Sequence, residues 1–179
     1  MIETERLILR HWRASDRAPF AALNAAAKVC EFLPKRLGRE ELDALADRIA
    51  GHFEERGFGL YAVERQDTGA FIGFTGLAVP RFEAPFMPAV EIGWRLAHAH
   101  WGQGFATEAA RAALAHAFGP LDLENIVSFT VPANMRSRAV MEKIGMQHDP
   151  ADDFDHPLLP PGDPLRRHVL YRINRDEVA

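Results

Sequence analysis

The chain has 179 residues, of which 47% are hydrophobic and 26% are charged, and its formal net charge is −4. This length and composition are typical of one globular domain with a full hydrophobic core. The negative net charge and the lack of a Lys/Arg block remove any electrostatic case for nucleic-acid binding.

The N-terminus and the cysteine content bear on the compartment. The sequence begins Met1-Ile2-Glu3-Thr4-Glu5-Arg6, which lacks the apolar region of a secretion signal. No run of about 18 apolar residues is present that could span a membrane. Cys30 is the single cysteine and cannot form an internal disulfide. We therefore expect a cytoplasmic protein that does not bind a membrane.

The first half of the chain shows strand and helix patterns in turn. Leu7 and Leu9 lie on one side of a predicted strand, and Phe20, Leu23 and Ala27 recur at helical spacing after a cap at residues 15–16. The predicted elements are a strand over 4–12, this helix, a second helix over 39–56, and strands over 60–65 and 70–79 joined as a hairpin by Gln66-Asp67-Thr68-Gly69.

The second half alternates strands and helices. Residues 80–88 form a predicted loop with exposed-looking Phe82, Phe86 and Met87, and the proline-rich residues 150–164 resist regular structure. The predicted elements are a strand over 90–96, a helix over 107–118, a strand over 125–131, a helix over 135–144 ending at Gly145, and a last strand over 167–175. Without a repeat or a linker, residues 1–179 are expected to form a single α/β domain.

The segment Trp101-Gly102-Gln103-Gly104-Phe105-Ala106-Thr107 joins a predicted strand to a predicted helix. Gly102 and Gly104 can adopt positive φ, so successive backbone N–H groups would point into one concavity beside the positive end of the helix dipole. Such a site binds a phosphate. No Gly-Lys-Ser/Thr follows, as a Walker motif requires, and the third glycine of a dinucleotide fingerprint is missing. A plain strand-to-helix turn is the alternative.

A second segment follows the strand over 125–131 and opens a helix: Asn134-Met135-Arg136-Ser137-Arg138-Ala139-Val140-Met141-Glu142-Lys143-Ile144-Gly145. With the glycine segment, in this order and spacing, it resembles the acetyl-CoA-binding core of the GCN5-related N-acetyltransferase (GNAT) superfamily. The opening Glu3–Arg10 is similar to the branch that includes ribosomal-protein N-terminal acetyltransferases. The resemblance covers residues 4–146.

The resemblance implies an α/β (α+β) fold. This is a mixed, mostly antiparallel sheet of about seven strands flanked by about four helices, with a V-shaped splay between the two core strands. Acetyl-CoA would lie in the splay as co-substrate, without a metal. The backbone of Gly102, Gln103, Gly104, Phe105, Ala106 and Thr107 would hold the pyrophosphate, Trp94, Arg95 and Leu96 would line the pantetheine arm, and Asn134 would hydrogen-bond it. Trp101 departs from the family's usual Arg or Gln, which removes a charged contact but leaves the amides.

The implied reaction is direct attack of an amine on the acetyl thioester, which needs positioning, removal of one proton and stabilisation of an oxyanion. Our hypothesis is that Glu91 is the base and that Ser137 donates a proton to the departing thiolate. The alternatives are a solvated carboxylate at a strand end for Glu91 and a capping serine for Ser137. An α-amine, with a pKa near 8, is an easier acceptor than a lysine, with a pKa near 10.4.

Other side chains have weaker cases. His98 and His100 are spaced as strand neighbours, but no third metal ligand is placed to help them. Cys30 suits a small buried side chain. The acceptor pocket is expected at residues 30–37, 82–87 and 149–164. Asp149, Asp152, Asp153 and Asp155 would suit a cationic acceptor or simply form a solvated loop, and Phe82, Phe86 and Met87 would form a lid or a homodimer contact.

The leading hypothesis is an acetyl-CoA-dependent N-acetyltransferase that acts on a primary amine, including a protein N-terminus. Acetylation of a small amine, such as a polyamine, an amino acid or a drug, is the alternative within the class. A non-catalytic acyl-CoA-binding sensor module is the alternative outside it.

Overall fold

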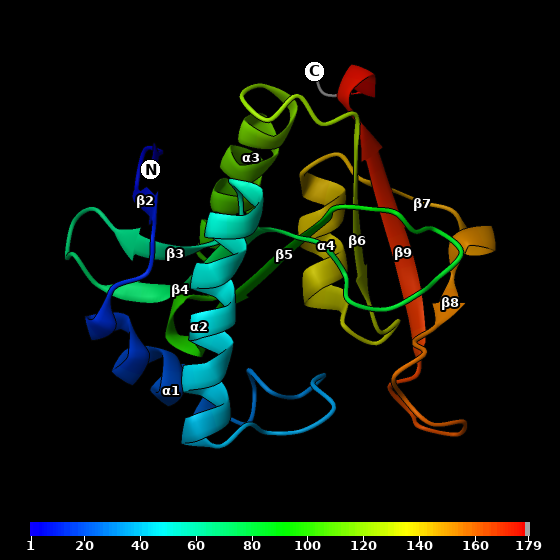
Figure 1. Cartoon of the computed structure of the whole chain (residues 1–179), viewed down its shortest axis with the longest axis horizontal. Helices are drawn as coiled ribbons and strands as arrows, with labels where there is room; N and C mark the ends of the chain where they lie inside the picture. The colour runs from blue at the N-terminus through cyan, green and yellow to red at the C-terminus, as the bar shows by residue number, and fades with distance from the viewer. Residues whose placement is uncertain (178–179) are drawn as a thin grey trace.

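The structure is a computed structural model that describes residues 1–177. A single twisted sheet runs through the molecule, with helices on both sides (Figure 1). The α-helices of the described residues are α1 (Arg17–Ala25), α2 (Arg39–Arg56), α3 (Phe105–Phe118) and α4 (Met135–Lys143). Its strands are β1 (Ile2–Glu3), β2 (Leu7–Arg10), β3 (Leu60–Arg65), β4 (Phe71–Ala78), β5 (Glu91–Leu96), β6 (Asn125–Thr130), β7 (Gln147–His148), β8 (Phe154–Asp155) and β9 (Arg167–Asn174).

The sheet is mixed and mostly antiparallel, as expected. Its order is β1-β2-β3-β4-β5-β6-β9-β7, with β8 also paired to β9, and β5–β6 is the one parallel pair among the described residues. The sheet has nine strands where about seven were expected, and three of the nine, β1, β7 and β8, have two residues each. So short a segment carries no alternating pattern from which a strand can be predicted.

The two core strands β5 and β6 diverge, which confirms the expected V-shaped splay. They share one Cα register pair, Glu91 with Val127, whereas β4 and β5 share six. Next to that pair, the Ser128 hydroxyl donates to the Ile92 carbonyl at 2.9 Å. Beyond it the strands separate toward their carboxyl ends, and backbone groups of both strands are left facing the gap.

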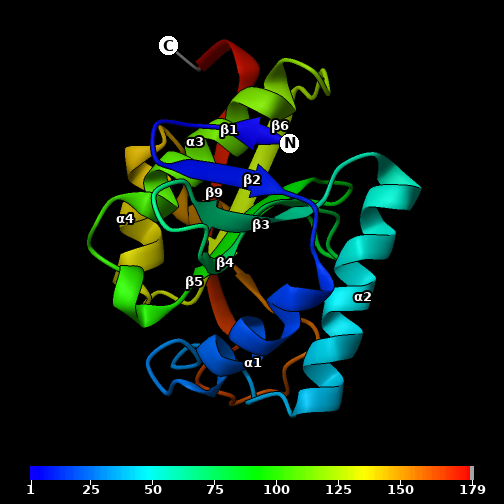
Figure 2. The same ribbon diagram turned by 90° about the vertical axis from the view of Figure 1, so that its left-hand side faces the viewer.

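Helices cover the two faces of the sheet. On one face, Phe20 and Leu23 of α1 and Leu42 of α2 pack against Phe74 of β4. On the other face, α3 lies against β4 and β5 through a run of alanines that permits close approach. Figure 2 shows α2 on the opposite side of the sheet from α3 and α4. The buried residues of the α3 cluster include Leu77, Ile92, Ala110, Ala113, Leu114, Ala117 and Ile126.

Several element boundaries differ from the prediction. The helix expected over 107–118 begins at Phe105, because Gly104 at positive φ is already its N-cap. The strand expected over 4–12 is shorter, Leu7–Arg10, because the preceding residues form a turn in which the Thr4 amide donates to the Leu7 carbonyl. His98 and His100 are not strand neighbours but lie in a 3₁₀ turn over His98–His100.

The loop over 80–88 is not freely exposed. Phe82 and Phe86 are partly buried and pack against an internal cluster that contains Phe154 and Leu170. Both rings thus have partners within the chain, and their role as a lid or as a contact between two copies stays a prediction. A homodimer stays a prediction.

Candidate active site

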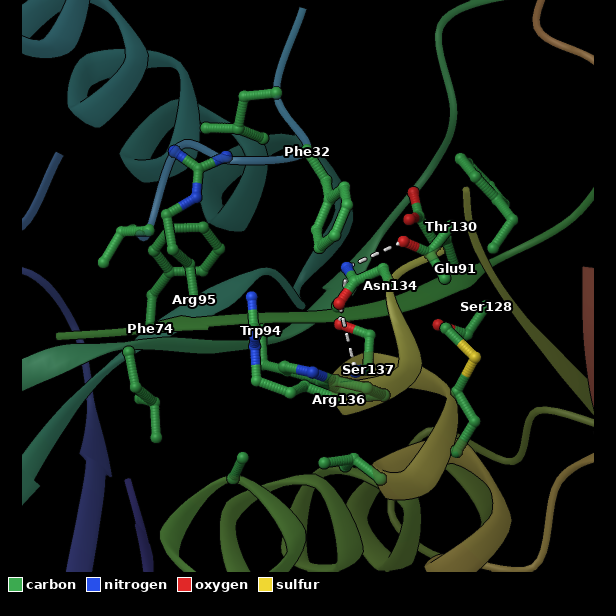
Figure 3. A pocket seen from close by; sticks show the side chains of 18 of the residues that line it. Phe32, Phe74, Glu91, Trp94, Arg95, Ser128, Thr130, Asn134, Arg136 and Ser137 are labelled. Carbon is green, nitrogen blue, oxygen red and sulfur yellow. Dashed lines mark hydrogen bonds between the residues drawn. The ribbon is translucent and has the colours of Figure 1, made fainter. Parts of the chain in front are cut away.

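A cleft of about 900 Å³ passes through the gap between β5 and β6 and opens on both faces of the sheet. On one side it reaches the glycine turn before α3, and on the other it reaches the segment between α1 and α2 (Figure 3). It brings together nearly all of the residues selected from the sequence: Glu91, Trp94, Arg95, Leu96, Trp101, Gly102, Gly104, Phe105, Ala106, Thr107, Asn134 and Ser137. Gln103 is the exception, since its exposed side chain donates to the Ala99 carbonyl.

The glycine turn has the backbone geometry predicted for an anion site. Gly102 and Gly104 have φ of +74° and +84°, and a Cβ built at Gly102 would meet no atom within 4 Å. Within residues 1–177, the backbone N–H groups of residues 102–107 donate to no protein acceptor. These free donors at the start of a 14-residue helix fit a pyrophosphate.

Trp101 and Arg136 lie in contact beside the glycine turn. The Trp101 indole N–H donates to the Leu96 carbonyl at 2.8 Å, which ties the turn to the end of β5. The Arg136 guanidinium lies 4.7 Å from the centre of the Trp101 ring and forms an ion pair with Glu31 at 2.6 Å. A cation therefore lies at the cleft beside the turn. Sequence reasoning missed Arg136, although its place two residues after Asn134 was a signal.

Asn134 and Ser137 form one hydrogen-bonded unit at the start of α4. Asn134 is the N-cap, and its Oδ1 accepts from the Ser137 amide at 3.3 Å. Its Nδ2 donates to the Thr130 hydroxyl at 3.0 Å and to the Ser137 hydroxyl at 3.2 Å. Both amide hydrogens of Asn134 are thus used within the chain, so a ligand would find only its Oδ1. The Ser137 hydroxyl accepts from Asn134, which leaves its own hydrogen free to point into the cleft.

Glu91 lies at the floor of the cleft, where β5 and β6 begin to separate. Its carboxylate makes no hydrogen bond or ion pair within residues 1–177, and burial raises its pKa from 4.5 to about 8. A Cβ added at Gly93 would come 4.0 Å from Glu91 Oε1, so the missing side chain keeps the space beside this carboxylate open. These surroundings differ from those of a solvated strand-end carboxylate.

Arg95 faces away from the predicted pantetheine path. Successive strand residues point to opposite faces, so Arg95 shares the face of Glu91, while Trp94 and Leu96 point toward α3. Its Nη1 donates to Asn24 Oδ1 of α1 at 2.7 Å. The side chain was expected at the cofactor but lies on the α1 side, and only the backbone of Arg95 remains a candidate for the pantetheine arm.

The side of the cleft near α1 is more apolar than expected. The aspartates of the 149–164 loop do not line it: Asp152 is paired with Arg172, Asp153 with His148, and Asp155 with Arg166 and Arg167, and Asp149 caps a 3₁₀ turn. The residues of that loop that do line it include His156, Leu158 and Leu159, and residues 82–87 do not reach it. Cys30 is buried, as expected, and its thiol donates to the Asn24 carbonyl.

Residues 1–177 contain neither a membrane-spanning helix nor a metal-binding cluster of side chains. None of their helices combines the length and apolar character needed to cross a membrane. Nor do these residues contain a group of three or more His, Cys, Asp or Glu side chains arranged to hold a metal ion.

Comparisons with known proteins agree with this geometry. The model of the acetyltransferase (GNAT) domain matches residues 6–147. The chain is 38% identical over 115 residues to FsC-acetyl coenzyme A-N(2)-transacetylase of Aspergillus fumigatus, covering 61% of this chain and 48% of that protein. It thus spans about half the length of this relative, and 55% of a second curated relative that is also 38% identical.

Two solved structures share the whole fold. An acetyltransferase of Agrobacterium tumefaciens has a TM-score of 0.77 at 29% identity and covers 97% of this chain and 93% of its own. The ribosomal-protein-S5-alanine acetyltransferase of Vibrio fischeri has a TM-score of 0.76 at 17% identity, with coverage of 99% and 97%. At 17% identity the second likeness shows the fold alone. The family model matches most of the chain, and the protein belongs to the GNAT acetyltransferase family.

Proposed function

We propose that the protein is an acetyl-CoA-dependent N-acetyltransferase that moves an acetyl group directly to a primary amine. The observation that carries the proposal is the continuous cleft that joins six free backbone N–H groups at the α3 turn to a partly buried carboxylate with no partner within residues 1–177. Family membership and the 38% identical CoA-dependent transacetylase support it.

Acetyl-CoA, when bound, would supply the electrophilic thioester carbonyl. The amides of residues 102–107 would hold its pyrophosphate, with the cation of Arg136 nearby. Those amides need a rigid frame to act as a preorganised site. The Trp101–Leu96 hydrogen bond and the α3 helix provide it.

Glu91 would accept the proton of the attacking ammonium. A carboxylate with a pKa of about 8 is protonated and deprotonated in comparable amounts near pH 8, close to the working pH that suits a general base. That pKa matches an α-amino group, near 8, and is about two units below that of lysine. The match favours an α-amine over a lysine side chain as acceptor. Ser137, with a free hydroxyl hydrogen, would donate to the departing thiolate.

The test is release of free thiol from acetyl-CoA in the presence of a panel of peptides and a panel of small amines. Glu91→Gln should lower kcat by about 10²- to 10⁴-fold with acetyl-CoA affinity unchanged, because general-base catalysis contributes on that order. Glu83→Gln, which changes an exposed carboxylate outside the cleft, should match the wild type. An unchanged kcat in Glu91→Gln would remove Glu91 from the mechanism. Stabilisation by CoA without thiol release from any amine would favour a non-catalytic binding module.

A further inference from the structure

Arg95 is a cation inside the cleft that has no acidic partner. Its one hydrogen bond within residues 1–177 runs to Asn24 Oδ1 at 2.7 Å, and its guanidinium lies 5.4 Å from the centre of the Phe74 ring. Asn24 is itself buried and fixed, because its Nδ2 donates to the Phe20 carbonyl at 2.8 Å. The guanidinium is therefore held in place while its other N–H groups have no protein acceptor in the described chain.

Arg10 is a buried arginine with a structural role, and acidic side chains of the chain neutralise its charge. Arg10 is paired with Asp16 at 2.7 Å and with Glu64 at 2.6 Å. A desolvated cation without such a counter-charge is unfavourable, and burial lowers the pKa of Arg95 accordingly. The missing counter-charge of Arg95 is best supplied by a ligand in the cleft.

The charges along the cleft point to the same conclusion. Glu91 is the only acidic side chain among the residues that line it. Lys28 and Arg95 lie toward α1, and Lys143 lies at the end of α4, while Arg136 is paired with Glu31 of the segment between α1 and α2. A polycationic acceptor would find one carboxylate and several positive charges there. An acceptor that carries a negative group would find its complement at Arg95.

The positions of Glu91, Gly93 and Arg95 set the distance between the two ends of such a ligand. All three share one face of β5, and Gly93 leaves an open hollow between the two charged side chains. Four residues of strand separate their Cα atoms by about 13 Å. A negative group at Arg95 and an amine near Glu91 must therefore be several bonds apart, with Phe32 and Leu158 among the apolar side chains of this region.

We propose that the acceptor is a primary amine that carries a carboxylate several bonds from its nitrogen, and that Arg95 binds this carboxylate. The planar guanidinium matches a carboxylate through two parallel N–H groups, which gives both affinity and orientation. The inference deepens the proposed acetyltransferase function and rests on it. Arg95 thus determines specificity, while Glu91 acts on the amine.

The experiment compares acceptors that differ only in this charge. Trialanine and trialanine amide test a free carboxyl terminus, and Ala-Glu-Ala amide and Ala-Gln-Ala amide test a side-chain carboxylate such as a protein N-terminus would offer. Thiol release gives kcat/KM, and calorimetry with CoA present gives binding of the same peptides. The carboxylate member of at least one pair should be favoured about 10- to 100-fold, as expected for charge-assisted hydrogen bonds.

Arg95→Gln should remove this preference, so that the kcat/KM values of the two members of each pair differ by less than about threefold. Lys28→Gln, which removes the exposed cation of the same region, should keep it. Equal kcat/KM and equal binding for both members of each pair in the wild type would overturn the inference, even if Arg95→Gln failed to fold. A preference that survives in Arg95→Gln, or that disappears in Lys28→Gln, would overturn it as well. Preferential binding without any thiol release would instead overturn the proposed function alone.

Discussion

Glu91 is a partly buried carboxylate and Asp16 a fully buried one, and their surroundings shift their pKa values in opposite directions. Burial pushes the pKa of Asp16 upward, but hydrogen bonds from the Arg10 side chain and the Arg13 amide outweigh it, so the net pKa is lowered. Glu91 has no such donors, and burial alone raises its pKa to about 8. The first arrangement is typical of structural ion pairs, whereas the second leaves a carboxyl group ready to exchange a proton.

The raised pKa of Glu91 makes a prediction about stability. Because its pKa in the folded protein lies above the ordinary 4.5, ionisation favours the unfolded chain as pH rises from about 4.5 to 8, and the loss is complete above that. Glu91→Gln should therefore melt at a higher temperature than the wild type, with the difference growing between pH 5 and 8. The difference in the free energy of unfolding can grow by at most about 1.4 kcal/mol per pH unit. Each kcal/mol corresponds to about 2–4 °C in Tm.

Melting curves of both proteins from pH 5 to 9 provide the measurement. Glu83→Gln is the matched control, because its carboxylate is exposed and its melting profile should parallel that of the wild type. A constant difference between Glu91→Gln and the wild type across this range would mean that the Glu91 pKa is not raised in the folded state.

At the scale of single elements, the turn before α3 combines a required backbone conformation with an open space. Gly102 and Gly69 share these two properties: φ is +74° and +68°, and a Cβ at either would meet no atom within 4 Å. Gly69 lies in the β3–β4 hairpin, outside the cleft. Matched substitutions at Gly102 and Gly69 therefore distinguish the cost of backbone strain from a loss of ligand binding.

Gly102→Asp and Gly69→Asp should lose similar stability, about 1–2 kcal/mol, since both place a side chain on a left-handed backbone. Only Gly102→Asp should weaken CoA binding, by about tenfold or more, because its carboxylate would lie among the amides expected to hold the pyrophosphate. Calorimetric titration with CoA and melting curves measure the two effects. Equal CoA affinity in both variants would show that the turn is not the phosphate site.

For the molecule as a whole, the long elements and the glycine turn were predictable because each rests on local signals. The helix predicted over 39–56 and the hairpin predicted around residues 66–69 are both present in the structure. The cleft-lining positions followed from two motifs whose spacing resembled a known family, and all but Gln103 line it.

What the sequence could not supply depends on contacts between distant segments. The Arg95–Asn24 contact joins residues 71 positions apart, and the Arg136–Glu31 pair joins residues 105 apart. The aspartates of the 149–164 loop looked like a cationic-acceptor site because their arginine and histidine partners on β7, β9 and the preceding loop were invisible to a local reading. The period-2 rule did place Arg95 on the face of Glu91, and that signal was available.

The separation of β5 from β6 predicts how bound CoA changes hydrogen exchange on the two sides of the sheet. The β5 and β6 halves of the sheet share one register pair, so a ligand that touches both sides of the gap should add contacts that the protein lacks. CoA would touch residues 94–107 on one side and 130–137 on the other, whereas inorganic pyrophosphate would reach only the glycine turn. Hydrogen exchange should therefore slow on both sides with CoA, and only around residues 102–108 with pyrophosphate.

Comparing hydrogen exchange with CoA and with pyrophosphate distinguishes a pantetheine arm that lies between β5 and β6 from one that extends into solvent. Free CoA at about 100 times its Kd stabilises the folded state by about 2.7 kcal/mol, which is large enough to slow exchange in the segments that it holds together. The turn over residues 66–69 of the β3–β4 hairpin has no residue among those that line the cleft and serves as the internal control. Protection by CoA confined to residues 102–108 would place the pantetheine arm in solvent, away from Glu91 and Ser137, and those two side chains could then take no part in the transfer.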